Sequence, residues 1–163
     1  MSEVRWLSDQ EQAVWRSYLA ATTMLREHIE RRLQRDAQMP QTYYEVLVAL
    51  SEAPDMKLRM SELADASRSS RSKLSHAVNR MERSGWISRD DCDVDRRGSW
   101  ARLTEKGFAV IHAAAPDHVA TVREALFDVL TPEQVRQLGE ISAAIAGNLA
   151  GECAKVREEE GTL

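Results

Sequence analysis

The chain has 163 residues, 43% of them apolar and 29% charged, which is enough to bury one core with helical extensions. It has no apolar run of membrane-spanning length, no apolar leader segment near Met1, and only two cysteines, Cys92 and Cys153. We therefore expect a cytoplasmic protein without membrane contact, and the net charge of −4 argues against a nucleic-acid partner unless the charge is unevenly spread.

Capping residues divide the first half of the chain into helices. Ser8 and Glu11 form a capping box that predicts a long helix over residues 9–35, and a similar pattern at Thr42 predicts a second over 43–52. Two short helices follow, over 60–66 and 71–83. Ser70 precedes the second of these, and Gly85 supplies the flexible residue that typically ends a helix.

The second half changes from strand to helix patterning. Strand-forming residues at 86–89 and 99–103 flank a polar segment, which predicts a β-hairpin. A helical stripe over 108–129, kinked at Pro116, and a capped helix over 132–158 complete the chain. The predicted fold class is mainly α with a small β-hairpin.

The two ends of the chain are long amphipathic helices around a compact middle. Their apolar stripes are long relative to that middle, so pairing of two chains would bury them well. The alternative is that the stripes pack on each other within one chain.

Charge is distributed unevenly along the chain. Residues 57–106 contain 12 Lys and Arg against 8 Asp and Glu, a net charge of +4. The remaining residues contain 10 against 18, a net charge of −8. The basic segment coincides with the short helices and the hairpin, so the overall charge does not exclude a nucleic-acid partner.

The two short helices and their tight turn form a helix-turn-helix. In the second helix Leu74, Val78 and Met81 share one face, which predicts burial there. Hydrogen-bonding side chains occupy the rest of the helix, where a recognition helix meets base edges and phosphates in the major groove. The predicted contact residues are Ser70, Arg71, Ser72, Lys73, Ser75, His76, Asn79 and Arg80.

The hairpin is a candidate wing. Arg89 lies on its first arm and Arg96 and Arg97 near its tip, where arginine gains from the negative potential of a narrow minor groove. Asp95 is spaced to form an ion pair with Arg97 that shapes the loop. The alternative is that these arginines form an ordinary solvated surface.

Four motifs occur in the order found in one family of regulators. They are LRMSELA at 58–64, SRSKLS at 70–75, MERSGWI at 81–87, and DRRG at 95–98 leading to Leu103 and Thr104. In this arrangement the chain resembles the MarR family of winged helix-turn-helix transcriptional regulators. One departure is Arg59, which stands where the family usually has a hydroxyl residue capping the first helix of the motif.

The resemblance implies a homodimer that binds double-stranded DNA at a pseudo-palindromic operator, usually as a repressor. It divides the chain into an N-terminal dimerisation helix (1–36), a winged helix-turn-helix domain (37–104) and C-terminal dimerisation helices (105–163). It also implies a small aromatic or phenolic effector bound between the winged domain and the dimerisation helices. The aromatic residues of the first two helices are candidates to line that site: Trp15, Tyr18, Tyr43 and Tyr44.

Other chemistry has little support in the sequence. The acidic run around Asp93 lacks the glycine and terminal glutamate of a calcium loop, and the histidines have no metal-ligand spacing. We expect no metal, no cofactor and no enzymatic activity, because no catalytic motif is present. The rival hypothesis is a winged-helix protein that binds small molecules or proteins but has lost DNA binding.

Overall fold

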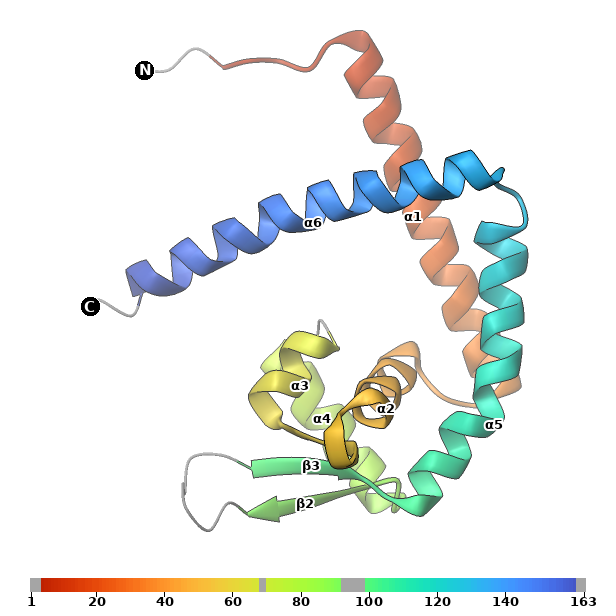
Figure 1. The fold of residues 1–163 in the computed structure, drawn as a ribbon, viewed down its shortest axis with the longest axis vertical. Coiled ribbons are helices and arrows are strands. Elements are labelled where there is room, and N and C mark those ends of the chain that lie inside the picture. The colour runs from red at the N-terminus through yellow and green to blue at the C-terminus, as the bar shows by residue number, and fades with distance from the viewer. Residues whose placement is uncertain (1–3, 68–69, 92–98, 161–163) are drawn as a thin grey trace. The chain divides into compact units, whose positions relative to one another are not determined.

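A computed structural model describes residues 4–67, 70–91 and 99–160, without the side chains of Arg71, Asp91 and residues 151–160. The chain forms two compact units, residues 1–121 and 122–163. In the described ranges, the first unit contains helices α1 to α5 and a small sheet, and the second contains a helical turn and the long helix α6 (Figure 1). The expected fold class, mainly helical with a small β element, is confirmed.

Helix α1 (Asp9–Asp36) begins at the predicted capping box. The Ser8 amide donates to Glu11 Oε2 at 2.7 Å, and the Glu11 amide donates to Ser8 Oγ at 3.3 Å. The predicted apolar stripe divides along the helix, because Leu33 is buried and Ile29 packs against the core, whereas Val14 is exposed. Only the C-terminal half of α1 is anchored to the rest of the unit.

Helix α2 (Gln41–Glu52) begins two residues earlier than predicted, so the expected capping role of Thr42 is wrong. The N-cap is Pro40, and the free Gln41 amide donates to Glu30 Oε2 of α1 at 2.9 Å. A carboxylate from another helix therefore satisfies this amide, and Thr42 lies inside the first turn. The contact also fixes α1 against α2.

The winged lobe, residues 41–104, combines α2 with the remaining short elements. After a 3-10 turn (Pro54–Met56) come β1 (Lys57–Arg59), α3 (Met60–Ala66), α4 (Arg71–Arg83), β2 (Ile87–Asp91) and β3 (Ser99–Leu103). Both helices of the motif and both arms of the hairpin are as predicted to within two residues. Strand β1 was not predicted, because three residues are too few to show a period.

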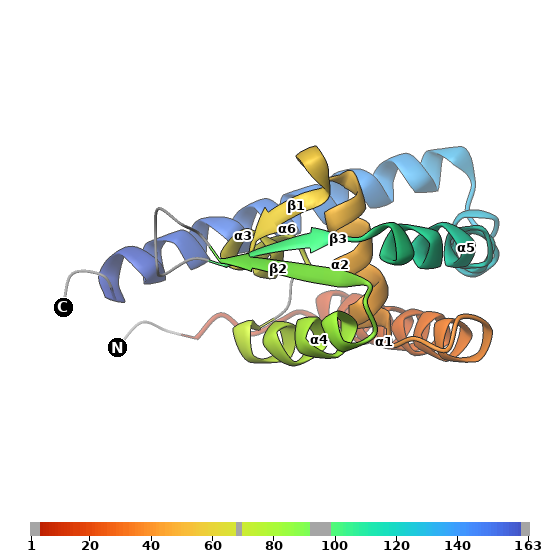
Figure 2. The same cartoon turned by 90° about the horizontal axis from the view of Figure 1, so that it is seen from below.

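The sheet is antiparallel with strand order β1-β3-β2 (Figure 2). On β3, Ala101 and Leu103 are buried, and on β2 Ile87 pairs with Leu103 and is buried too. This inner face packs on the helices. The apolar core of the lobe lies between them and consists mainly of Val46, Leu47, Leu50, Leu63, Leu74, Val78 and Met81.

A glycine turn joins α4 to β2. Gly85 has φ +73°, its amide donates to the Glu82 carbonyl at 2.9 Å, and the Trp86 amide donates to the Met81 carbonyl at 2.9 Å. This is the Schellman arrangement that the predicted role of Gly85 requires. Thr104 then ties the start of the next helix to the same turn, because its hydroxyl donates to the Gly85 carbonyl at 2.7 Å.

Helix α5 (Glu105–Val122) starts against that turn and continues through Pro116. A bend within α5 is visible in Figure 1, as expected where proline removes a backbone hydrogen bond. At its start, Gly107 lies so close to the Trp86 carbonyl that a Cβ at this position would be 2.1 Å from that oxygen. The glycine therefore permits α5 to leave the sheet at this point.

In the second unit a π-helical turn (Arg123–Phe127) precedes α6 (Pro132–Glu160). The predicted cap is confirmed, since the Thr131 amide donates to Gln134 Oε1 at 2.9 Å and the Gln134 amide donates to Thr131 Oγ1 at 3.3 Å. Ile141, Ile145 and Leu149 recur along α6 at intervals of four and are exposed. Within its own unit, α6 leaves this stripe uncovered.

Candidate nucleic-acid interface

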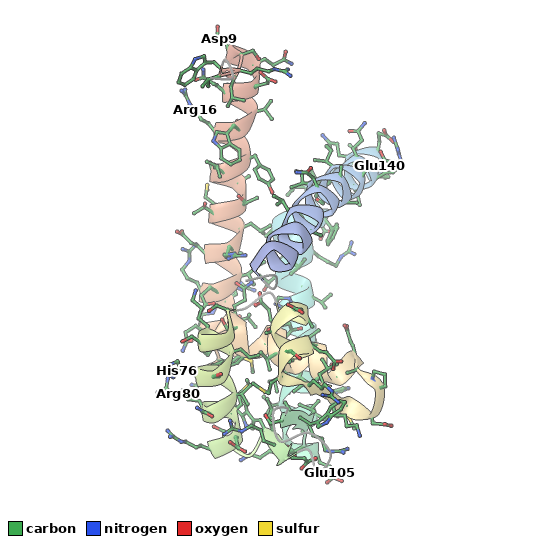
Figure 3. All side chains as sticks on the ribbon, turned by 90° about the vertical axis from the view of Figure 1, so that its left-hand side faces the viewer. Asp9, Arg16, His76, Arg80, Glu105 and Glu140 are labelled. Atoms are coloured by element: carbon green, nitrogen blue, oxygen red, sulfur yellow. The ribbon has the colours of Figure 1, made fainter. Side chains whose placement is uncertain are left out.

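Helix α4 presents one apolar and one polar face. Leu74, Val78 and Met81 are buried, as predicted, and so is Ala77. Asn79 is half-buried at the edge of the polar face. His76 and Arg80 project from the same side of the helix, away from the lobe (Figure 3). The exposed predicted contact residues are Ser70, Ser72, Lys73, Ser75, His76 and Arg80.

The N-terminus of α4 is a capped helix end. Ser70 is the N-cap, and its hydroxyl oxygen accepts from the Lys73 amide at 3.4 Å. Exposed backbone amides and the positive end of the helix dipole favour an anion here, and the exposed Lys73 adds a charge. Arg71 is the first residue of α4. The arrangement suits a phosphate oxygen at the start of the helix and base edges farther along it.

The first arm of the wing is tied to α4. Arg89 Nε on β2 donates to Glu82 Oε2 at 3.0 Å, and a second guanidinium nitrogen contacts the same oxygen. These hydrogen bonds lower the pKa of the Glu82 carboxyl, since they favour its charged form. Arg89 therefore lies on the wing arm as predicted, and its guanidinium links the hairpin to the helix-turn-helix.

The wing tip falls outside the described residues. This applies to Arg96, Arg97, their predicted neighbour Asp95, and Cys92. The ion pair between Asp95 and Arg97, and the role of both arginines, stay predictions.

The four aromatic residues predicted to line an effector site lie in three places. Trp15 and Tyr18 stack with ring centroids 6.3 Å apart on the exposed half of α1. Tyr43 meets the edge of Trp86 at 6.5 Å, inside the winged lobe. Tyr44 is buried, with its ring 4.1 Å from the ring of His118 on α5. The structure does not bring the four together around one cavity.

A cavity of about 230 Å³ lies instead between the end of α1, the loop after it and α5. Its walls include Leu33, Met39 and Val110, and its polar groups include Arg32 and His118. Tyr44 adjoins it through His118. Sequence reasoning missed these residues, because α1 and α5 lie far apart along the chain and no local spacing links them.

The polar groups of this cavity are incompletely satisfied. Arg32 Nε lies 3.4 Å from Asp36 Oδ2, and Arg35 also donates to that carboxylate, which lowers the pKa of Asp36. His118 Nδ1 is buried and has no hydrogen-bond partner within the described residues, and burial lowers the pKa of this imidazole. An imidazole and a guanidinium that line the same cavity can hydrogen-bond a hydroxyl or an acidic group.

Among the residues that the structure describes, no group of three or more His, Cys, Asp or Glu side chains is arranged to hold a metal ion. The side chain of Cys153 is outside that description. No helix in the described ranges is both long and apolar enough to cross a membrane.

Comparison with known proteins gives matches that agree with the fold and the interface described above. A model of the MarR family matches residues 37–98, which include the helix-turn-helix and the first arm of the hairpin and end just before β3. Sco3205, a MarR family transcriptional regulator from Streptomyces coelicolor solved in complex with DNA, is 52% identical. That match covers 91% of this chain and 93% of Sco3205, with a TM-score of 0.87.

Two further relatives extend the comparison. AbsC, another MarR family regulator from Streptomyces coelicolor, is 41% identical over 91% of this chain and 99% of its own, with a TM-score of 0.84. The transcriptional repressor MprA of Escherichia coli is 28% identical over 109 residues. That match covers 67% of this chain and 61% of the length of MprA.

Proposed function

This chain belongs to the MarR family of transcriptional regulators, and from that premise we propose that it binds double-stranded DNA sequence-specifically as a homodimer and regulates transcription. The exposed polar face of α4, held by a buried apolar face beside a hairpin, is the observation that carries the proposal. A helix with this division inserts into a major groove while the lobe behind it stays rigid.

We assign base and phosphate contacts to different parts of α4. The amide of Asn79 and the guanidinium of Arg71 can each make two hydrogen bonds to one base, and His76 and Arg80 project from the polar face of α4. Ser72 and Lys73 lie at the capped N-terminus, where phosphates bind. The wing arginines Arg96 and Arg97 complete the interface in the adjacent minor groove.

The homodimer forms through the flanking helices, residues 1–36 and 105–163, with residues 37–104 as the DNA-binding domain. Support comes from the exposed apolar side chains of α1 and α6. Such side chains are costly in water and are typical of a subunit interface. Two copies of α4 would then read the two halves of a pseudo-palindromic operator. The largest of these exposed side chains are Trp15, Tyr18, Leu19, Ile141, Ile145 and Leu149.

We propose further that the regulator is a repressor released by a small aromatic or phenolic effector. The cavity beside α5 is the site best suited to it, since its largely apolar lining also carries the guanidinium of Arg32 and the imidazole of His118, with Asp36 and Asp117. An acidic effector would compete with Asp36 for Arg32 and donate a ring hydroxyl to His118 Nδ1. We place the protein in the cytoplasm, as a regulator rather than an enzyme, because its proposed partner is genomic DNA.

Selection from a random duplex library with the purified full-length protein tests DNA binding and defines the operator. We expect a two-fold symmetric site whose affinity falls steeply as salt rises, because each phosphate contact releases counterions. Failure to enrich any sequence, or an affinity indifferent to salt, would overturn the proposal in favour of a winged protein that does not bind DNA.

The effector proposal has its own test on the selected operator. Aromatic acids and phenols are added to the complex, and release of DNA is followed by fluorescence anisotropy. An effective acid should lose potency on Arg32→Gln, whereas Arg31→Gln, which changes an exposed arginine one residue away, should respond as the wild type. Equal responses from both variants would remove the cavity from the mechanism.

A further inference from the structure

The outer face of the winged sheet carries a cationic cluster that the recognition helix and the wing tip do not account for. Because Ala101 and Leu103 point into the core, Trp100 and Arg102 point outward from β3. On the neighbouring strand, Arg59 pairs with Trp100 and Lys57 with Arg102, so both cations share that face. Trp100 lies on the central strand of this face, between β1 and β2.

The two β1 cations are held against the indole. Arg59 Cζ lies 5.1 Å and Lys57 Nζ 5.3 Å from the centroid of the Trp100 ring. These contacts restrict two long side chains, so less rotamer entropy is lost when they bind an anion. Arg59 is free for this role because it does not cap α3 through its side chain: its amide donates to Glu62 Oε2 at 2.9 Å, and its guanidinium points to Trp100.

The cluster keeps its positive charge. Arg102 Nε lies 3.5 Å from Asp90 Oδ2, so this arginine is partly neutralised by β2. No described carboxylate forms an ion pair with Lys57 or Arg59. Among the residues that the structure describes, two cations without an ion-pair partner therefore remain on a half-exposed surface built around one aromatic ring.

The position of the cluster indicates what it contacts. Trp100 is the second residue of β3 after the wing tip, so Trp100 and Arg59 lie at the tip end of the sheet. Strand β2 lies beside α4, and β1 forms the opposite edge (Figure 2). When the wing tip lies in a minor groove, the DNA that continues outward from the half-site passes the wing on the side away from α4. The outer face of the sheet would lie next to that flanking DNA.

We propose that Lys57 and Arg59 bind backbone phosphates of the DNA flanking the operator, outside the wing contact. The inference rests on the proposed DNA-binding function and extends its footprint outward from each half-site. Phosphates are the favoured partner over an acidic protein surface because the cluster adjoins the wing and would continue a surface already directed at DNA. Such contacts are independent of base sequence and add affinity by neutralising charge.

The test compares two duplexes carrying the same selected operator. One ends at the outer limit of the wing contact, and the other extends by roughly 10 base pairs, one helical turn, on each side. We expect the wild-type dimer to bind the longer duplex more tightly, on the order of tenfold, with a steeper salt dependence of about 0.9 for each added phosphate contact.

The double variant Lys57→Ala/Arg59→Ala should bind both duplexes with the affinity that the wild type shows for the short one. The control, Arg31→Ala/Arg35→Ala, removes the same charge from exposed positions of α1 and should keep the advantage of the longer duplex. Thermal unfolding of each variant checks that the lobe is folded.

The outcomes separate the two levels of proposal. Equal affinity of the wild type for both duplexes would overturn the proposed contact with flanking phosphates, and an acidic protein would then be the better candidate partner for this face. Binding to the operator itself would not be affected. Equal losses in the double variant and the control would overturn it as well, since the effect would then follow total charge. If the wild type shows no specific binding to the short duplex, the proposed function of sequence-specific DNA binding itself is wrong.

Discussion

The winged lobe and the flanking helices differ in how completely they bury their apolar side chains within one chain. In the lobe, amphipathic helices and the sheet pack their apolar faces together, so that Leu47, Leu63 and Val78 have no exposed surface. Along α6, and along the first half of α1, apolar side chains such as Ile145 and Trp15 stay exposed within the chain. The lobe therefore buries its apolar side chains within a single chain, whereas the flanking helices need a second protein surface to cover theirs.

The largest effect is expected where the flanks are broken. Ile145→Glu should dissociate the dimer and lower operator affinity on the order of a thousandfold, about 4 kcal/mol. The variant loses the burial of one side chain in each chain, about 1.5–3 kcal/mol apiece, and places a charge in an apolar interface. Analytical ultracentrifugation measures the first effect and anisotropy the second.

Ala143→Glu is the matched control for that variant, since residue 143 lies on the side of α6 opposite Ile145. It should stay dimeric and bind the operator. If Ile145→Glu also stays dimeric, Ile145 of α6 does not lie in the dimer interface, and the proposed difference between the lobe and the flanking helices is wrong.

A pair of glycine substitutions compares the two regions directly. Gly107→Ala should destabilise the protein by about 3 kcal/mol, because the new Cβ would lie 2.1 Å from the Trp86 carbonyl and backbone must move to admit it. Gly139→Ala in α6 meets no atom within 4 Å and should stabilise the helix by about 0.5–1 kcal/mol.

Urea unfolding of both glycine variants provides the measurement. A loss of stability at position 139 comparable to that at 107 would mean that α6 is packed closely against a second chain there. The sign of the change at 139 therefore reports how far the flank departs from an isolated helix.

The same contrast explains what could be predicted from sequence. Helix α4 was predicted at its observed bounds because Ser70 and Gly85 act through neighbouring residues. Thr42 misled because the amide at the start of α2 is satisfied by Glu30, a residue of another helix, which no local pattern shows. Strand β1 exists because β3 pairs with it from more than forty residues away.

For the candidate site, prediction succeeded where helical period decides exposure. The exposed face of α4 follows from the spacing of Leu74, Val78 and Met81. The cavity did not follow, since Arg32 and His118 come to line one cavity only after α1 and α5 have packed. The Trp100 cluster likewise depends on the pairing of β1 with β3.

Within α4, two alanine variants should separate specificity from affinity. Asn79→Ala should cost roughly 1–3 kcal/mol at the preferred operator and relax the preference at one position. Lys73→Ala should weaken binding to all sequences alike and reduce the salt slope by about 1. Anisotropy across operator variants at several salt concentrations measures both, and a uniform loss in Asn79→Ala would exclude that residue from base recognition.

The smallest effect concerns the link between wing and helix. Glu82→Gln removes the charge that Arg89 pairs with and should destabilise the lobe by no more than about 1 kcal/mol at neutral pH, because the pair is partly exposed. Since Arg89 lowers the pKa of Glu82 in the folded protein, the wild-type advantage is present above the ordinary glutamate pKa. It is lost as pH falls through the lowered value, where folded Glu82 becomes protonated. Urea unfolding of both proteins at neutral and acidic pH should therefore converge on acidification, and a difference that persists in acid would mean that Glu82 stabilises the lobe by packing rather than by charge.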